Sequence, residues 1–466
     1  MTIKVIPNAV SVDVDTPSDA YRNMEELWAL PDILMDGERT LKEFGRTYLP
    51  QHPRELDDVY THRLLISRLF NVYRHTVKNL TGRVFSNDII LNNDVPGEIR
   101  DWWENIDLQG NDGNRFFRAP LEDGINKGLS HVYVDFPRTE GDLTLAEEKE
   151  RRPYCVHVPA DHLIKAVAEN VNGKLVLARA HIKEPYTVPI SRWSDVEQTQ
   201  IRVLYPGRWE LYRKDIDNAG HEKGRYALYD TGTTGLDFIP LYTFYANEVG
   251  FHLARPMLED LAYLNLGHYQ LYSDYRNILH VANVPILYAT GFNEKKLSSV
   301  EIGPNKIFHG PKDSTLAYVE HNAKAIPVAQ KELEATEARM AFCGLEPLID
   351  RPDRETYGAH AIDTTQSNSQ LYDVALRLQD TIGNVLGAMA AYRDLGGGGS
   401  VVVNQDFGLK MRDKAELSNL VEMAKLNLIP LEQFYEELKR RKFLSKDFDI
   451  AGSVSSLTVI PTEKEE

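Results

Sequence analysis

Residues 256–285 read PMLEDLAYLNLGHYQLYSDYRNILHVANVP, and this stretch decides the fold. It begins and ends with proline but has no proline in between, and apolar side chains recur at helical steps, so the spacing predicts one helix. At 1.5 Å per residue this helix is about 40 Å long. Polar residues, among them Asn265, His268 and Asp274, occupy most of its other positions. We therefore expect one narrow apolar stripe to be buried and the rest to face solvent or neighbouring subunits.

A small β insertion and a second helix are predicted after this first helix. Residues 285–326 contain the β-branched and aromatic runs PILYAT and TLAYVE, separated by Gly-Pro turns, which predict short strands. The second helix is expected from Pro327 to Phe342, because proline is tolerated in a first turn and Gly344 ends the pattern. The sequence therefore predicts a helix, a small β insertion and another helix.

The chain before the first helix is predicted to be helical and then stranded. Residues 18–85 have helical spacing interrupted at Pro31 and at 49–53, and Leu65–Val84 is predicted as one amphipathic helix with a basic outer face. Residues 130–245 change to a period of two with turn residues between the runs, which predicts an antiparallel sheet. We therefore expect an α+β fold.

The chain after the second helix is predicted to continue with a long loop and a long helix. Residues 346–365 have no sustained period, whereas apolar residues from Leu371 to Tyr392 predict a helix. The glycine run 396–399 is expected to be a flexible joint, and VVVN (401–404) a strand. Two short helices are expected between Lys414 and Arg441.

The composition is that of an acidic globular protein. Among 466 residues, 69 Asp and Glu outnumber 53 Lys and Arg, so the net charge is −16 and an ordinary basic nucleic-acid binder is disfavoured. Cys155 and Cys343 do not form a disulfide framework. The N-terminus lacks the pattern of a signal peptide, and no apolar run is long enough to span a bilayer. We therefore expect neither a signal peptide nor a membrane-spanning segment.

We find no catalytic motif. The sequence lacks GxxxxGK[ST], HExxH and GxSxG, and His157 and His162 miss the spacing of two metal ligands on a helix. Cys343 precedes Gly344 at a helix end, where the helix dipole raises the pKa of a thiol. We therefore predict that the protein is not an enzyme and has no catalytic residue, no metal and no cofactor.

The loop 346–365 leaves one enzymatic alternative open. Asp350, Asp353 and Glu355 could hold Mg²⁺ in a nucleic-acid hydrolase. Arg351 and Arg354 are interleaved with these carboxylates, which favours ion pairing at the surface instead.

Three stretches carry a family resemblance. They are IPLYTFYANE with the following residues to 291 (239–291), ETYGAHAIDTTQSNSQLYDVALRLQDTIGNVLGAMAAYRDLG (355–396) and LIPLEQFYEELKRRKFL (428–444). Together they resemble a family of tailed-bacteriophage proteins, long catalogued as a domain of unknown function, that is similar to portal proteins. The resemblance spans most of the chain, from about Tyr21 to Phe448.

The resemblance implies a portal-protein fold with wing, stem, clip and crown, assembled as a ring of normally twelve subunits. The implied order is a wing (1–255), a first stem helix (256–284), a clip (285–326), a second stem helix (327–344), a tunnel loop (345–364), a wing helix with its return strand (365–408) and a crown (409–466). The clip and the crown are short for this family.

The implied function is the channel at one capsid vertex through which double-stranded DNA is packaged, retained and ejected. The implied partners are further copies of the chain, the terminase large subunit as packaging motor, a head–tail adaptor, the major capsid protein and a scaffold protein, with no membrane. The ring would assemble in the bacterial cytoplasm and remain in the virion. Another virion ring, a head–tail connector or a minor capsid protein are the structural alternatives.

A channel of this kind agrees with the charge. Twelve helices packed about 8 to 10 Å apart enclose a bore of about 28 Å, which admits a DNA duplex. Twelve copies at −16 each carry 12 × −16 = −192, which disfavours tight binding of phosphates. Isolated basic residues are then the expected DNA contacts, and the candidates are Arg351, Arg354, Lys324 and Lys331.

Overall fold

The chain forms two compact units, residues 1–406 and 407–466. The computed structural model describes residues 13–137, 151–217, 220–283, 286–291, 313, 315–319, 325–344, 357–405, 407, 421–426, 429–440, 444, 448 and 450. The first unit mixes helices with strands that pair antiparallel throughout the described residues, as the predicted α+β class requires. No helix in this described part is both long and apolar enough to cross a membrane.

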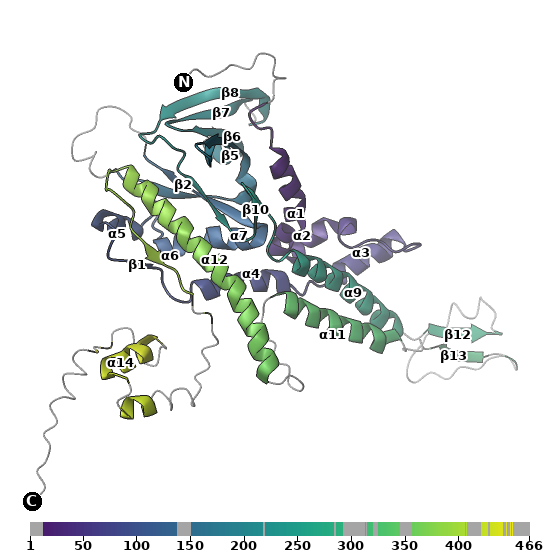
Figure 1. Ribbon diagram of the computed structural model, residues 1–466. Helices are drawn as coiled ribbons and strands as arrows, with labels where there is room; N and C mark the ends of the chain where they lie inside the picture. Colours follow the sequence, from purple (N-terminus) through teal and green to yellow (C-terminus); the bar gives the residue numbers. More distant parts are fainter. Residues whose placement is uncertain are drawn as a thin grey trace, which may run out of the picture. The chain divides into compact units, whose positions relative to one another are not determined.

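The elements of the first unit are as follows (Figure 1). The helices are α1 (Asp19–Asp36), α2 (Glu38–Glu43), the 3₁₀ turn η1 (Gly45–Thr47), α3 (Asp57–Ile66), α4 (Val72–Val84), α5 (Gly97–Trp103), α6 (Gly113–Phe116), α7 (Arg118–Lys127), η2 (Ala160–His162), α9 (Glu259–Asn283), α11 (Ala325–Cys343) and α12 (Tyr357–Ala391). The strands are β1 (Ile90–Leu91), β2 (Leu129–Asp135), β3 (Tyr154–Val158), β4 (Leu163–Val171), β5 (Lys174–Ser191), β6 (Ser194–Tyr205), β7 (Arg208–Ile216), β8 (Glu222–Thr233), β9 (Leu241–Tyr245), β10 (Glu248–Gly250), β11 (Leu253–Ala254), β12 (Ile286–Thr290), β13 (Thr315–Val319) and β14 (Val401–Val402).

Two sheets and helix α1 form one part of the core, to which α4, α7 and α12 also contribute buried apolar side chains. The larger sheet has the order β4-β5-β6-β7-β8 and the smaller one the order β3-β2-β9, so the strands predicted between 130 and 245 are confirmed. One face of the larger sheet carries Ile201 and Val203, which pack against Tyr21, Met24 and Trp28 of α1. Its other face meets the smaller sheet. The buried side chains of that second cluster are Tyr133, Val158, Leu163, Ala180, Ile182, Leu204, Ile239 and Leu241.

Helix α1 runs through Pro31, so the predicted interruption there is wrong. Proline removes one helical hydrogen bond, but apolar burial on both sides of it compensates for that loss. Trp28 and Leu34 are buried against the body on either side of Pro31. Ser18 caps the helix, and its hydroxyl oxygen accepts a hydrogen bond from the backbone N–H of Tyr21 at 3.2 Å. The second predicted interruption, at 49–53, is confirmed by the absence of a helix there.

The helix predicted over Leu65–Val84 is divided. Helix α3 ends at Ile66, residues 67–71 are not helical, and α4 begins at Val72. The break occurs because Asn71 caps α4: its side-chain oxygen accepts from the N–H of Arg74 at 2.9 Å. The basic face also differs from the prediction, since Arg63 is buried whereas Leu65 is exposed.

Helix α12 begins earlier than predicted. Residues 357–364, assigned to a loop of residues 345–364, are helical. These residues contain no proline. A helix that is already stabilised by packing in its later turns can therefore extend through them. The rest of that loop lies outside the described residues.

The second half of the glycine run 396–399 is packed, so the prediction of a flexible joint is wrong for Gly398 and Gly399, whereas Gly396 and Gly397 have open space around them. A Cβ on Gly398 would lie 2.3 Å from the backbone N of Gly387 in α12, and one on Gly399 would lie 2.5 Å from Cα of Val95. Glycine is therefore required for the chain to pass this close to α12. Strand β14 follows, as predicted, and pairs with β1.

The second unit contains one described helix of ten residues, α14 (Leu431–Arg440), and a short helical segment at 421–426. Leu438 of α14 is buried, and the ring of Tyr435 contacts that of Phe448 at 5.7 Å. The predicted separation of two helices near 427–430 agrees with the helix start at Leu431.

Candidate functional site

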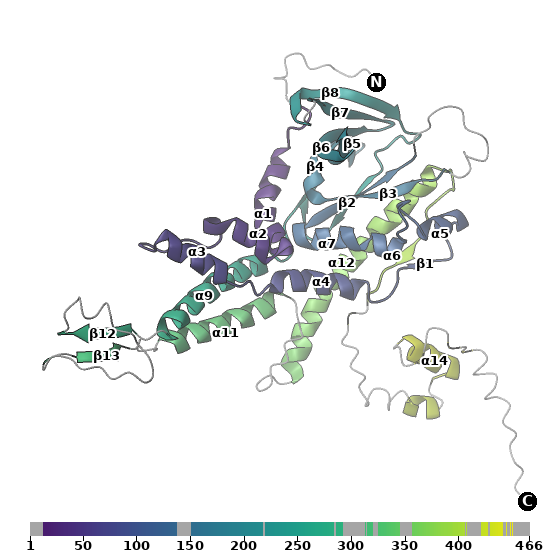
Figure 2. The same ribbon diagram turned by 180° about the vertical axis from the view of Figure 1, so that it is seen from behind.

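Helix α9, the hairpin β12–β13 and helix α11 form the predicted helix, β insertion and helix (Figure 1). The two strands pair antiparallel over five residue pairs, from Ile286 with Val319 to Thr290 with Thr315. Helices α9 and α11 lie side by side in both views (Figure 2). Pro327 lies in the first turn of α11, where the missing N–H costs no helical bond.

Among the described residues, helix α11 is buried along one side. Its buried residues are Leu333, Thr336, Met340 and Ala341. Val328 and Phe342 are 68% and 71% exposed. A helix that leaves large apolar side chains in water on the side away from its packed face is typical of a surface that another molecule covers.

Of the four DNA-contact candidates, the structure places one. Lys331 lies on the exposed side of α11. The neighbouring Glu332 pairs with Arg339 at 3.3 Å. Arg351, Arg354 and Lys324 lie outside the described residues, as do Asp350, Asp353 and Glu355, so both the tunnel-loop prediction and its ion-pairing alternative stay predictions.

The side of α9 that faces the body buries polar side chains beside the apolar Leu261 and Ala262. The side-chain oxygen of Asn265 accepts from the N–H of Tyr73 at 2.9 Å, and its amide nitrogen donates to the carbonyl of Phe70 at 3.0 Å. The hydroxyls of Tyr269 and Ser67 share a hydrogen bond of 2.9 Å. Asn265 and Tyr269 are fully buried, so the predicted burial of an apolar stripe alone is wrong. Sequence periodicity missed this because it counts apolar residues only.

A buried ion pair continues this polar contact towards the far end of α9. Arg63 of α3 donates to both carboxylate oxygens of Glu55 at 2.8 Å and to the carbonyl of Pro50 at 2.8 Å. It also lies 3.5 Å from Asp274 of α9, which is 3.0 Å from Nε2 of His52. Hydrogen bonds from Arg63 lower the pKa of Glu55 although burial opposes this. Polar contacts of fixed geometry therefore hold α3 against α9.

One family model matches part of the chain. Residues 256–393 match the sequence profile of the family described as "Domain of unknown function (DUF4055)". The matched segment begins just before α9 and ends just after α12. No curated protein matches the chain.

The solved structures that are similar to the chain include three of gene transfer agent (GTA) particles. The neck of an empty GTA particle, computed with C6 symmetry, has 12% identity and a TM-score of 0.44 over 84% of this chain and 90% of that chain. The neck of the native GTA particle, computed with C12 symmetry, has 12% identity and a TM-score of 0.42 over 84% and 90%. The virion of the native gene transfer agent particle has 11% identity and a TM-score of 0.42 over 91% and 99%.

A charged cluster that the sequence did not reveal joins α7, α1 and the turn η2. The amine of Lys127 lies 2.6 Å from Asp161, 3.4 Å from Asp123 and 3.6 Å from Asp32. Burial raises the pKa of Asp32 to about 6, against the attraction of Lys127. The next residue, Gly128, has a φ of +93°, and a Cβ there would lie 2.2 Å from the carbonyl oxygen of Arg255.

The histidine and cysteine side chains considered above are packed within the described part of the fold. His157 shares a hydrogen bond of 2.9 Å with Ser130, and burial lowers its pKa. Burial raises the pKa of both thiols, Cys155 and Cys343, with Asp260 adding to the shift of Cys343. The described part of the chain contains no group of three His, Cys, Asp or Glu residues placed to hold a metal. The absence of an enzyme activity, a metal and a cofactor stays a prediction.

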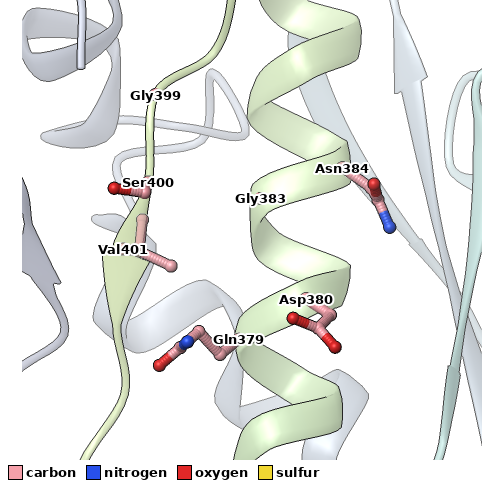
Figure 3. A pocket seen from close by; sticks show the side chains of 7 residues that line it. All are labelled: Gln379, Asp380, Gly383, Asn384, Gly399, Ser400 and Val401. Carbon is pink, nitrogen blue, oxygen red and sulfur yellow. The ribbon is translucent and has the colours of Figure 1, made fainter. Parts of the chain in front are cut away.

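An open polar pocket of about 430 Å³ is lined by residues of α12 and of the segment 399–401 (Figure 3). Gln379 points towards the strand, whereas Asp380 and Asn384 point away from it. The side-chain oxygen of Gln379 accepts from the N–H of Val403 at 3.2 Å, so this residue fastens the returning chain. The cavity is open because Gly383 has no side chain to fill it. We assign it a packing role.

Proposed function

We propose that the protein is a phage portal protein: a ring at one capsid vertex through which double-stranded DNA is packaged, retained and ejected. The observation that carries this proposal is the pair α9 and α11, joined by a short β hairpin, with most of α11 uncovered. The sequence resemblance supports the same function. In the ring, α9 and α11 form the stem, β12–β13 belong to the clip, the larger sheet and α12 to the wing, and the second unit to the crown.

The charges of α11 support a channel that does not grip DNA. The helix carries Glu332, Glu334 and Glu337 against Lys331 and Arg339. A wall with excess negative charge repels phosphates, and each isolated cation makes a contact that is weak and easily broken by salt. Lys331 is therefore our candidate for a transient DNA contact, together with Arg351, Arg354 and Lys324.

The same function implies a set of partners. The chain would assemble with copies of itself into a ring, normally of twelve. It would also bind the terminase large subunit, a head–tail adaptor, the capsid protein and a scaffold. The β12–β13 hairpin is the part proposed to meet the adaptor and the motor, because it lies at the end of the helix pair away from the body (Figure 1). The protein would act without catalysis and would remain in the virion.

Mass and shape test the proposal. A ring of twelve chains has twelve times the 53.0 kDa mass of one chain, and mass photometry separates the two species clearly. Negative-stain images should then show rings with a central hole wide enough for a duplex. A protein that remains at 53.0 kDa at every concentration tested would refute the proposed ring.

A packaging assay tests the role of the ring. A phage that lacks this gene and is complemented with the Lys331→Glu variant should assemble heads but contain less full-length DNA than the wild-type complement. The matched control is Glu334→Gln, one turn away on the same helix. It removes a charge but leaves Lys331 in place. Heads that package DNA normally without any copy of this protein would overturn the function.

A further inference from the structure

Strand β8 forms one edge of the larger sheet. Among the described residues, β8 pairs only with β7, so no described strand lies along its other side. In an antiparallel sheet, about half of the N–H and C=O groups of an edge strand point away from its single partner. With twelve residues, β8 is long enough for a further strand to pair with it. An open edge of this length is a site at which extended chain binds.

The second half of β8 lacks the features that keep an edge unpaired. Charged side chains and proline commonly protect edge strands. Lys223 and Arg225 lie in the first half of β8, whereas residues 227–233 contain no proline and only one charged residue, Asp230. The edge is therefore protected at one end and open at the other.

The open half also leaves an apolar side chain uncovered. Leu228 is the register partner of Tyr212 in β7, so both lie on the face of the sheet that α1 covers. Tyr212 and Tyr226 pack against the buried cluster on that face, whereas Leu228 is 56% exposed. A strand added at the edge would place its own side chains beside Leu228.

The described chain begins close to this edge. Val14 packs against the same cluster, and its carbonyl accepts a hydrogen bond from Nδ1 of His181 at 2.8 Å. The carboxylate of Asp15 interacts electrostatically with Lys214 of β7 and with Tyr226 of β8. In both views the chain that leads into α1 lies beside β7 and β8 (Figures 1 and 2). The residues that come before this point in the sequence are therefore tethered within reach of the edge.

The twelve residues that precede Asp13 have a sequence suited to that edge. They read MTIKVIPNAVSV and lie outside the described residues. Val10 and Val12 alternate with Ser11 and Asp13, and this period of two favours a strand. Pro7 has no N–H to donate, so it would end such a strand at its first residue. Twelve extended residues span about 40 Å, more than the roughly 23 Å of the open half of β8.

We propose that residues 8–12 pair with the second half of β8 in the same chain and form a sixth strand of the larger sheet. Val10 and Val12 then lie on the α1 face and cover Leu228, while Ser11 lies on the opposite face. The outward N–H and C=O groups of β8 gain backbone partners. The tether gives this segment an effective concentration of about millimolar at the edge, which favours it over any free chain. This pairing is independent of the ring proposed above.

Hydrogen exchange measured by mass spectrometry tests the pairing in the full chain. The variant Val10→Asp with Val12→Asp places two charges against Leu228 and should release the strand. The edge-facing amides of residues 227–233 should then exchange at least tenfold faster than in the wild type. The matched control is Thr2→Asp with Ser11→Asp, which adds the same charge to the same segment away from Leu228. Exchange in this control should equal that of the wild type.

The same measurement defines the contrary outcomes. Removing residues 2–12 should expose the edge as the first variant does, without introducing a charge. Peptides from β6 and β7 should be unchanged in every variant, which excludes unfolding of the sheet as the cause. Fast exchange of the edge-facing amides in the wild type refutes the proposal, as does equal protection in the wild type and in the chain without residues 2–12. Protection that disappears on dilution assigns the strand to a second copy and refutes pairing within one chain.

Discussion

Replacing Arg63 by methionine is expected to loosen helix α3 strongly. The side chains of Arg63 and Glu55 are 2% and 6% exposed, and the substitution leaves the carboxylate of Glu55 buried without its bidentate partner. Removing one member of a buried ion pair costs about 3 to 5 kcal/mol, because the remaining charge is desolvated and unpaired. At about 1.4 kcal/mol per factor of ten, the population of the locally open state should rise by about two to three and a half orders of magnitude.

Hydrogen exchange measured by mass spectrometry checks this expectation, because it reports the opening of residues 57–66 separately from the rest of the chain. The double variant Arg63→Met with Glu55→Met should recover most of the protection, since both buried charges are then gone. The matched control is Arg39→Met, which removes an equally close pair with Glu43 at 3.0 Å whose side chains are exposed, and should change the opening free energy by less than about 1 kcal/mol. Exchange in Arg63→Met that is no faster than in the Arg39 control would refute the reasoning.

Three further predictions concern the packing around α7 and α9. Gly128→Ala should lower the thermal unfolding midpoint sharply or prevent soluble expression, because its Cβ would meet the carbonyl of Arg255 in a backbone conformation that favours glycine; a normal midpoint would contradict the close approach. Asn265→Ala leaves the N–H of Tyr73 without its partner and should destabilise the protein by about 1 to 3 kcal/mol in urea unfolding, whereas an unchanged transition would show that water replaces the amide. Because burial raises the pKa of Asp32 from 3.8 to about 6, the folded state binds this proton more tightly, so the contribution of Asp32 to stability, measured as the difference between wild type and Asp32→Asn, should decline as pH rises from about 4 to about 6. That decline is about 1 kcal/mol after allowance for a side chain that is 42% exposed, and a difference that stays constant over this pH range would contradict the assignment.

Local sequence patterns predicted the elements whose formation depends on neighbours in the chain. The alternation of apolar residues between 130 and 245 predicted the sheets, and the prolines and turns near 285–327 predicted the order of helix, hairpin and helix. These features follow from backbone preference and side-chain period, which a short window contains. The same window was misleading at Pro31, because burial of Trp28 and Leu34 by distant elements outweighs one missing hydrogen bond.

The polar contacts of the candidate site could not be predicted in this way. Arg63 and Asp274 are 211 residues apart, Asn265 and Tyr73 are 192 apart, and Asn126 and Asp32 are 94 apart. A pattern search sees an arginine on a helix and assigns it to the outer face, since charged residues are seldom buried. The bidentate partner Glu55 is only eight residues away, but the fold alone brings Asp274, 211 residues away, within 3.5 Å of the same arginine.

The polar side of α9 is informative because an apolar one would serve stability at least as well. Replacing buried polar groups by well-packed apolar ones is often neutral or favourable, so Asn265, Tyr269 and Asp274 are not needed for adhesion alone. Hydrogen bonds differ from apolar contacts in requiring one register and one orientation. In the proposed ring, a stem helix that stands in the same place in every copy would gain from that requirement, because a small rotation of α9 would displace the adjoining α11 with it. The proposed function thus gives a reason why α9 buries polar side chains beside Leu261 and Ala262.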